Sequence, residues 1–356
     1  MFCITLQNRD HTKGFSLIEI MVGMGLGLLM VLIIMQAFSV FENQKRTTTA
    51  ASDAQENGLM AIVQLEQDIR NAGVGMADTA ALNCTTILSY YNGAVPAPGM
   101  PAAGEVIAPV RITDGGTTGS DTITLMRGSN FLGAIPAAIT ITMPPSSAEL
   151  NVSRTTGFAD GNLVLLSQGG NCTLIQVTQV QDSALKIQHN PGSSGPYNPS
   201  SNFYNSAPGN TWPAYTAGAQ AQNFGNLVIN TYSVDSNKNL QMSDASGVVT
   251  TLVKDIVSLQ AEYGIADTGT QDVNRSDQWV KADATSGFNT LDSAKVKRIK
   301  AVRITVVARS SKKEATNVTT SAPGGVDVST LTDWQKYRYR VYTTIIPLRN
   351  IIWANV

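Results

Sequence analysis

The segment Gly14-Phe15-Ser16-Leu17-Ile18-Glu19 carries the residues of this 356-residue chain whose types and spacing could do chemistry. Gly14 is the small residue at which a peptidase could cut, and the cut would remove the short hydrophilic stretch before it. Glu19 is the only charged side chain between Phe15 and Phe41. A bare carboxylate at the start of an apolar segment is costly in hydrocarbon. The segment therefore predicts processing after Gly14 and a specific role for Glu19.

The residues after Glu19 form an apolar run, from Ile20 to Phe38, that is long enough to cross a bilayer as a helix. A secretory signal would carry its apolar core before the cleavage site. Here the polar part comes first, so cleavage after Gly14 would keep the apolar helix on the mature chain. Two simpler interpretations remain: a plain N-terminal membrane anchor, and a capping box in which Ser16 and Glu19 only start the helix.

This arrangement resembles the signal of type IV prepilins and of the pseudopilins of type II secretion. The resemblance implies that a prepilin peptidase cuts between Gly14 and Phe15 and then methylates the new amino terminus, which is Phe15. It also implies that Glu19, the fifth residue of the processed chain, pairs with the N-terminal amine of a neighbouring subunit during assembly.

The sequence pattern divides the chain into four parts. Residues 1–14 would be a leader that is removed, and residues 15–41 a transmembrane or filament-core helix. Residues 42–72 contain no proline and place apolar side chains near helical spacing, which predicts an amphipathic continuation of that helix. Residues 73–356 would form a head on the periplasmic or extracellular side.

Two glycines inside the apolar run, Gly23 and Gly27, form a small-xxx-small pattern. Such a pattern lets two membrane helices approach closely, which makes this pair a candidate helix-packing site. The same spacing also arises by chance in a span that holds several glycines.

The head is predicted to be mostly β-structure. Segments that alternate apolar and polar residues are typical of half-buried antiparallel strands. The candidate strands are Val106–Thr113, Asp121–Arg127, Leu163–Ser167, Thr173–Val180, Leu227–Val234, Ile256–Tyr263, Lys300–Arg309 and Tyr337–Pro347. Along the segment that starts at Lys300, the even-numbered residues from Val302 to Ala308 are expected to face one side. The predicted fold class is therefore α+β, a long N-terminal helix packed on an antiparallel β-rich head.

Residues 190–225 hold no charged side chain but several aromatic ones. We predict a long irregular loop there. Its aromatic residues argue against full disorder, because they can bury against the domain. Packing on the head and contact with a partner are the two uses that such a loop could have.

The chain has three cysteines, Cys3, Cys84 and Cys172. Cys3 lies in the leader, which leaves an even pair in a part expected on the oxidising side of the membrane. We therefore predict a Cys84–Cys172 disulfide, with two buried free thiols as the alternative. Two cysteines with a single histidine are too few ligands for a zinc site.

Charge is segregated along the chain. Residues 47–292 hold 9 basic and 20 acidic side chains, whereas residues 293–356 hold 12 basic and 3 acidic ones. The simpler interpretation is that basic strands pair with acidic neighbours. The alternative is a basic face that meets an acidic subunit or DNA, although no nucleic-acid module accompanies it. That face would consist of Lys295, Lys297, Arg298, Lys300, Arg338 and Arg340.

An enzyme is not expected. His189 is the only histidine outside the leader, and neither a Gly-x-Ser-x-Gly elbow nor a phosphate-binding loop is present. Four aspartates, at 267, 272, 277 and 283, could ligate calcium, but their spacing does not match an EF-hand, and solvated turns are the simpler interpretation. No cofactor and no metal site are therefore predicted.

Further stretches resemble the PilW family of type IV pilus minor pilins. They are the helix end at residues 65–73 (Leu-Glu-Gln-Asp-Ile-Arg-Asn-Ala-Gly), residues 259–264 and 302–310, and the tail from Arg338 to Asn350. The J-type minor pseudopilins of type II secretion share the Asp-Ile-Arg-x-Ala-Gly helix end and remain the main alternative. An anchored adhesin or DNA-contacting protein is a further one.

The resemblance implies a role in assembly. Such a protein would be inserted in the inner membrane by a single span, with its head in the periplasm, and processed by the prepilin peptidase. It would then join other minor pilins, the major pilin and the inner-membrane assembly machinery, prime the pilus and remain at its tip.

Overall fold

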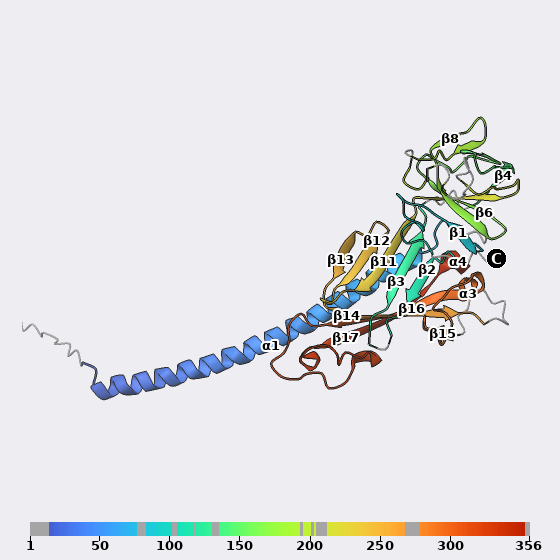
Figure 1. Cartoon of the computed structure of the whole chain (residues 1–356). Coiled ribbons are helices and arrows are strands. Elements are labelled where there is room, and N and C mark those ends of the chain that lie inside the picture. Colours follow the sequence, from blue (N-terminus) through green and yellow to red (C-terminus); the bar gives the residue numbers. More distant parts are fainter. Residues whose placement is uncertain are drawn as a thin grey trace, which may run out of the picture. The chain divides into compact units, whose positions relative to one another are not determined.

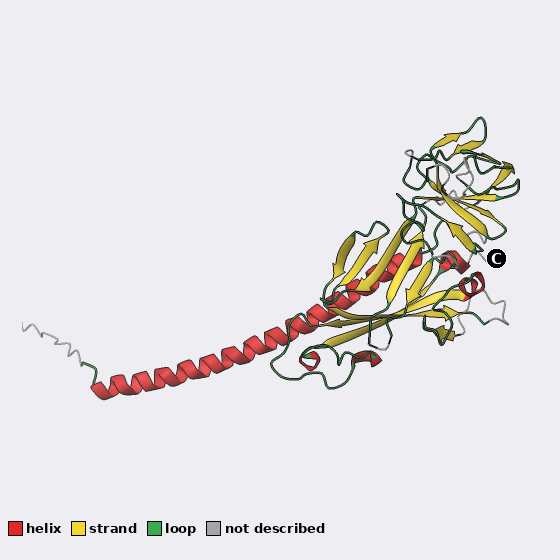
Figure 2. Ribbon diagram, viewed as in Figure 1, coloured by secondary structure: helices red, strands yellow, loops and turns green. Residues whose placement is uncertain are grey.

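The computed structural model describes residues 14–76, 83–101, 105–116, 118–129, 135–192, 195–200, 203, 212–267 and 278–352. The chain divides into two compact units, residues 1–51 and 52–356. Helix α1 (Leu17–Asn71) runs through the boundary between them, and all the strands belong to the second unit (Figures 1 and 2). The fold class is α+β, as the sequence predicts.

The first unit consists of the N-terminal part of α1. Its apolar side chains are exposed, including Phe15, Leu32 and Phe41. Of the helices that the structure describes, α1 is the one long and apolar enough to cross a membrane. A helix that is apolar on all sides is suited to a membrane or to the interior of an assembly rather than to water.

The second unit contains the rest of α1 and three β-sheets. The eight-stranded sheet has the order β1 (Thr86–Leu88), β7 (Asn171–Gln176), β6 (Leu163–Gln168), β10 (Gln220–Gly225), β4 (Ala137–Ile141), β5 (Glu149–Val152), β9 (Lys186–Gln188), β8 (Gln179–Gln181). The five-stranded sheet has the order β13 (Val249–Val253), β12 (Leu240–Asp244), β11 (Val228–Val234), β3 (Thr122–Arg127), β2 (Val110–Thr113). The four-stranded sheet has the order β15 (Gln278–Val280), β14 (Ile256–Ile265), β16 (Ile299–Arg309), β17 (Tyr339–Pro347).

Short helices complete the second unit: α3 (Ser293–Arg298), η2 (Pro323–Gly325), η3 (Trp334–Lys336) and α4 (Arg349–Ile352). Neighbouring strands pair in antiparallel fashion, except for β1 and β7, which run parallel.

The main core lies between α1, the five-stranded sheet and the four-stranded sheet. Ala61, Leu65 and Ile69 recur every four residues on α1 and are fully buried there against residues of β2, β3, β14 and β16. Past the helix end, Gly73 adopts a positive φ of 79°, which glycine tolerates best. The Asn350 side-chain amide donates to the carbonyl oxygen of Ala72 at 2.9 Å.

Strand β16 alternates as predicted only in its middle, from Val302 to Val306, because Ala301 and Val307 are buried as well. Val302, Ile304, Val306 and Ala308 are all buried, whereas Arg303 on the opposite face is half-buried. The Tyr263 hydroxyl on β14 accepts a hydrogen bond from the Ile112 amide on β2 at 2.6 Å, which links the four-stranded sheet to the five-stranded sheet.

The prediction of an irregular loop over residues 190–225 is wrong at its C-terminal end. Residues 220–225 form β10, which pairs with β4 and β6 inside the eight-stranded sheet. The strand is rich in amide side chains, which hid it in the sequence, but the NH2 groups of two of them are bonded inside the head. Gln222 donates to the carbonyl oxygen of Gly75 at 3.1 Å, and Asn223 donates to that of Gly157 at 2.6 Å.

Two further predicted strands differ from the structure. The segment predicted from Val106 becomes a strand only at Val110, and the one predicted over Thr173–Val180 is two strands, β7 and β8. The interruption falls at residues 177–178, just after the Val177 amide donates to the carbonyl of Asn162, the residue before β6.

Candidate functional site

The N-terminal segment forms the start of α1, and its polar atoms are arranged around Ser16. The Ser16 amide donates to Oε2 of Glu19 at 3.1 Å, and the Ile18 amide donates to Oγ of Ser16 at 3.3 Å. This is a capping box, so the simpler interpretation of Glu19 is realised in the structure. The other carboxylate oxygen of Glu19 accepts no hydrogen bond from the described residues, and the side chain is exposed.

Gly14 and Phe15 precede the helix in extended or irregular backbone, and both are exposed, Phe15 to 83%. The bond that the sequence predicts to be cut is therefore accessible in this conformation. Glu19 lies in the first turn of α1, where amides without helical partners favour a negative charge. The segment thus combines an accessible bond with a carboxylate that retains one free oxygen.

The two glycines of the small-xxx-small pattern lie on an open helix surface. A Cβ added at Gly23 or at Gly27 would meet nothing within 4 Å. Helix packing through these residues stays a prediction, since it concerns contacts with another chain.

The second half of α1 is fixed to the head by a buried polar contact that sequence reasoning did not single out. The Tyr232 hydroxyl on β11 donates to Oδ2 of Asp68, which also accepts from Nε2 of Gln64 at 3.1 Å. Burial and the adjacent Asp68 raise the pKa of Tyr232 well above its usual value. Asp68 belongs to the Leu-Glu-Gln-Asp-Ile-Arg-Asn-Ala-Gly segment that resembles the PilW family. Its partner Tyr232 lies 164 residues further along the chain, so the sequence did not indicate the contact.

The structure contains the predicted disulfide. Cys84 and Cys172 are bonded, with their Cα atoms 5.7 Å apart, and both are buried. The bridge ties the segment before β1 to β7, its parallel neighbour in the eight-stranded sheet. The disulfide therefore fixes the start of β1 to β7.

The alternative of a continuous basic face is wrong, because its members do not converge. The register of β16 and β17 pairs Ala308 with Arg340 and Ala301 with Pro347, so Arg340 and Lys300 lie at opposite ends of the sheet. Lys300 is buried to 95%, and desolvation lowers its pKa.

The basic strand residues instead meet acidic neighbours, as the simpler interpretation predicts. Arg303 pairs with Glu262 across β16 and β14, Arg309 with Asp255 at 3.4 Å, and Arg338 with Glu314 at 3.0 Å. Several basic side chains of the last 64 residues therefore form ion pairs within the head.

His189 lies in the core rather than in a cleft. Its ring is fully buried edge-on against Trp212, with ring centroids 4.8 Å apart. Burial lowers the pKa of His189 to about 3, so the ring is neutral at physiological pH. Neither ring nitrogen has a hydrogen-bond partner among the described residues. A histidine in this setting is a core residue and a poor general base.

The predicted calcium candidates are only partly covered by the structure. Asp272 and Asp277 lie outside the described residues, and Oδ1 of Asp283 accepts from the Ser286 amide at 2.8 Å in a turn. Within the ranges that the structure describes, no group of three or more His, Cys, Asp or Glu side chains is placed to hold a metal ion.

Comparison with known proteins matches both ends of the chain. Residues 214–350 match the family model described as type IV pilus-assembly protein W, PilW. Residues 9–35 match the prokaryotic N-terminal methylation motif. No curated protein and no solved structure matches the chain.

The PilW match covers β10 to α4, and therefore the whole four-stranded sheet and three strands of the five-stranded one. The methylation motif covers Gly14, Phe15, Glu19 and the apolar helix, which suggests membrane anchoring and association with a pilus. The resemblance stated from the sequence is confirmed as a similarity: the chain is similar to type IV pilus-assembly protein W over its C-terminal region and to the prepilin-type methylation motif at its N-terminus.

Proposed function

We propose that this protein is a minor pilin that helps to prime assembly of the type IV pilus within a complex of minor pilins at the filament tip. The observation that carries the proposal is that α1 begins with a prepilin-type segment and ends inside a head whose C-terminal region matches PilW. Residues 17–41 supply an exposed apolar stretch of α1, and the C-terminal part of the same helix is packed into the core of the head.

The N-terminal geometry supports an assembly step. The free carboxylate oxygen of Glu19 can accept the N-terminal ammonium of a neighbouring subunit, because a charge of this kind in an apolar setting is stable only when paired. A prepilin peptidase would first cut between Gly14 and Phe15 and methylate Phe15. The head would be periplasmic, on a single span of the inner membrane, until the subunit enters the pilus.

The size of the head supports a low copy number. The second unit comprises residues 52–356, which is bulky for the repeating subunit of a thin filament. The partners are then other minor pilins, the major pilin and the inner-membrane assembly machinery. We propose no enzymatic activity and no cofactor.

The second candidate is a J-type minor pseudopilin of type II secretion. It is favoured by the helix end at residues 68–73, Asp-Ile-Arg-Asn-Ala-Gly, which both classes share. An anchored DNA-contacting protein has less support, because the basic strand residues are paired with acidic ones.

A clean gene deletion tests the proposal, scored in parallel for surface pili in sheared fractions and for secreted enzyme activity. Loss of pili with normal secretion is the expected result, and complementation by the wild-type gene is the control. Intact pili with failed secretion would make the protein a pseudopilin. Two normal assays would refute the assembly role.

A further inference from the structure

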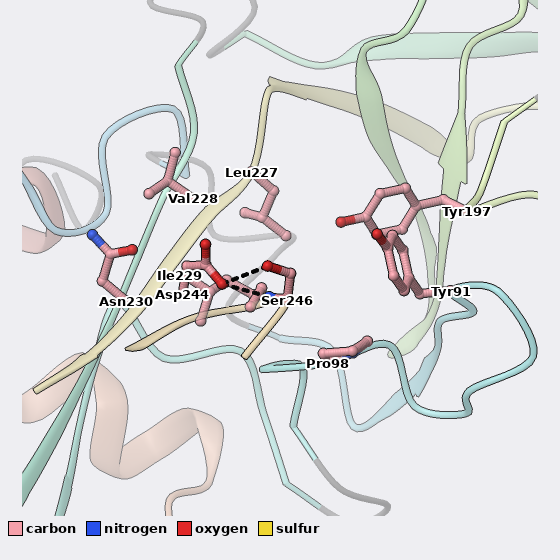
Figure 3. Close-up of a pocket in the computed structure, with 10 residues that line it drawn as sticks. Tyr91, Pro98, Tyr197, Leu227, Val228, Ile229, Asn230, Asp244 and Ser246 are labelled. Carbon is pink, nitrogen blue, oxygen red and sulfur yellow. Dashed lines mark hydrogen bonds between the residues drawn. The ribbon is translucent and has the colours of Figure 1, made fainter. Parts of the chain in front are cut away.

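A pocket of about 260 Å³ lies in the head where the eight-stranded and five-stranded sheets meet. Four segments of the chain contribute residues to it. It is lined by Tyr91, Pro98, Tyr197, Leu227, Val228, Ile229, Asn230, Asp244, Ala245 and Ser246 (Figure 3). Its volume is slightly below the roughly 300–1,000 Å³ of typical small-molecule sites, which suits a compact ligand.

The carboxylate of Asp244 is fixed in this pocket by hydrogen bonds from its own loop. Oδ1 of Asp244 accepts hydrogen bonds from the amide and hydroxyl of Ser246 and from the Val248 amide, at 2.7–3.0 Å. These bonds, led by the one from the Ser246 hydroxyl, lower the pKa of Asp244 and keep it ionised. Its Oδ2 accepts no hydrogen bond from the described residues, so one oxygen of a fixed carboxylate remains available.

Two tyrosines form the opposite wall. The rings of Tyr91 and Tyr197 pack edge to face with centroids 4.9 Å apart. Figure 3 shows their hydroxyl ends pointing towards Leu227 and Ser246. Neither hydroxyl has a hydrogen-bond partner among the described residues, although both can donate and accept.

The two tyrosines are held in place by the eight-stranded sheet. The Asn92 amide donates to the Pro196 carbonyl at 3.0 Å, which joins the two tyrosine-bearing segments. Buried Asn198 exchanges two hydrogen bonds of 2.8 Å with the backbone of Gln176 on β7. The Cys84–Cys172 disulfide fixes the start of the Tyr91 segment to the same strand.

The chemistry of the lining restricts the ligand. No Lys, Arg or His is among the described residues that line the pocket, so an anionic ligand would meet only the repulsion of Asp244. The apolar side chains of Pro98, Leu227 and Ile229 provide surface for C–H groups. A ligand that satisfies all of this has an apolar ring face and several neutral hydroxyl groups.

We propose that this pocket binds a single neutral pyranose sugar, such as the terminal unit of a surface glycan. The hydroxyl groups of the sugar would donate to Oδ2 of Asp244 and exchange hydrogen bonds with the hydroxyls of Tyr91 and Tyr197. Its C–H face would lie on Leu227 and Ile229. This goes beyond the assembly role, because it gives the head a ligand of its own.

An organic ammonium group is the competing ligand, since a carboxylate beside aromatic rings can also bind a cation. A cation–π site needs the faces of the rings turned towards the charge. In Figure 3 the hydroxyl end of Tyr197, rather than its ring face, points towards Leu227, which favours the sugar.

Saturation-transfer NMR on the full-length protein tests the proposal. The protein is kept in polyoxyethylene detergent, which carries neither sugar nor ammonium groups. The probes are the methyl glycosides of glucose, galactose, mannose and N-acetylglucosamine, with tetramethylammonium as the competitor. We expect transfer to at least one glycoside, and a several-fold loss of affinity in Tyr91→Phe, Tyr197→Phe and Asp244→Asn. These variants keep the rings or the shape of the side chain.

Tyr90→Phe is the matched control. It removes a hydroxyl one residue away, where the ring packs on Phe203 outside the pocket, and should leave the affinity unchanged. Four results would overturn the proposal: no transfer to any glycoside, equal affinity in the tyrosine variants, equal affinity in Asp244→Asn, or displacement of the glycoside by tetramethylammonium. The measurement uses isolated protein, so its outcome is independent of whether pili form.

Discussion

The ring of Tyr342 on β17 occupies the space that a side chain at Gly58 of α1 would need. A Cβ built at Gly58 would overlap two carbons of the ring and lie 3.3 Å from Cβ of Ala308. The Tyr342 hydroxyl donates to the carbonyl oxygen of Gln55, one turn earlier on α1, at 3.3 Å. The glycine is therefore required for the close approach of helix and sheet in the head.

Gly58→Ala should destabilise the head. Overpacking of a fitted contact costs roughly 1–3 kcal/mol, and the better helix propensity of alanine returns up to about 1 kcal/mol. We expect a net loss of about 1–2 kcal/mol in denaturant unfolding of the detergent-solubilised protein, followed by near-ultraviolet circular dichroism.

Gly25→Ala is the control, because a Cβ there meets nothing within 4 Å. The double variant Gly58→Ala/Tyr342→Ala should be less destabilised than the sum of the two single variants. Strict additivity would show that the ring and the glycine are not coupled.

Glu19 can be tested in a way that separates capping from assembly. Glu19→Gln keeps an oxygen that can accept from the Ser16 amide but removes the charge, whereas Ser16→Ala removes the capping hydroxyl and keeps the carboxylate. If Glu19 pairs with an N-terminal ammonium, Glu19→Gln and Glu19→Ala should both reduce the amount of protein in sheared pili several-fold, and Ser16→Ala should reduce it little.

Cleavage after Gly14 should be intact in all three variants, as judged by the mass of the membrane-bound protein. Normal amounts of Glu19→Gln in sheared filaments would leave capping as the sufficient role of this side chain. Gly14→Val, in contrast, should block the cleavage itself.

Loss of the disulfide should weaken the head strongly. Cys84 and Cys172 are 88 residues apart, and closing a loop of that length stabilises a fold by roughly 4–5 kcal/mol in the chain-entropy model. We expect Cys84→Ser and Cys172→Ser to lower the denaturation midpoint similarly, and the double variant to lower it no further. A double variant that is markedly worse than either single one would point to contacts of the thiols beyond the bond.

Acidification should destabilise the head through His189. The folded state holds this imidazole neutral down to a pKa of about 3, whereas the unfolded chain protonates near pH 6.5. The unfolded state therefore binds the extra proton, so stability is full above pH 6.5 and is lost as the pH falls towards 3. The loss at pH 5 is about 2 kcal/mol relative to pH 7.5.

The replacement His189→Phe keeps an aromatic ring against Trp212 and removes the titrating group. The difference in unfolding free energy between wild type and variant, measured from pH 7.5 to pH 5, isolates the histidine from other acidic groups. Parallel pH curves for the two proteins would contradict the prediction.

The sequence predicts well those features that depend on local composition. The start of α1 follows from Gly14, Glu19 and the apolar run, and its end from Gly73, because helix periodicity and helix stop signals lie within a few residues. The core-facing residues of strand β16, from Val302 to Ala308, can be predicted from the period of two in the sequence. The disulfide follows from cysteine number, since Cys84 and Cys172 are the one pair outside the predicted leader.

The tertiary structure alone decided what depends on distant partners. The amide side chains of strand β10 are typical of a loop in the sequence. In the structure, the carbonyl groups of Gly75 and Gly157 accept hydrogen bonds from two of them. The positive charges of the tail could form a basic surface as far as the sequence shows. In the structure, three of them pair with Glu262, Asp255 and Glu314.

The same holds for the close fit of Gly58 to Tyr342 and for the pocket between Tyr91, Tyr197 and Asp244. Each depends on residues that are distant in the sequence, and folding brings them together through the packing of whole sheets. Local propensity determined the helix, and the prepilin-type motif at its start is a local pattern of the sequence. Long-range packing determined which side chains meet, because that is decided only when the sheets assemble around the helix.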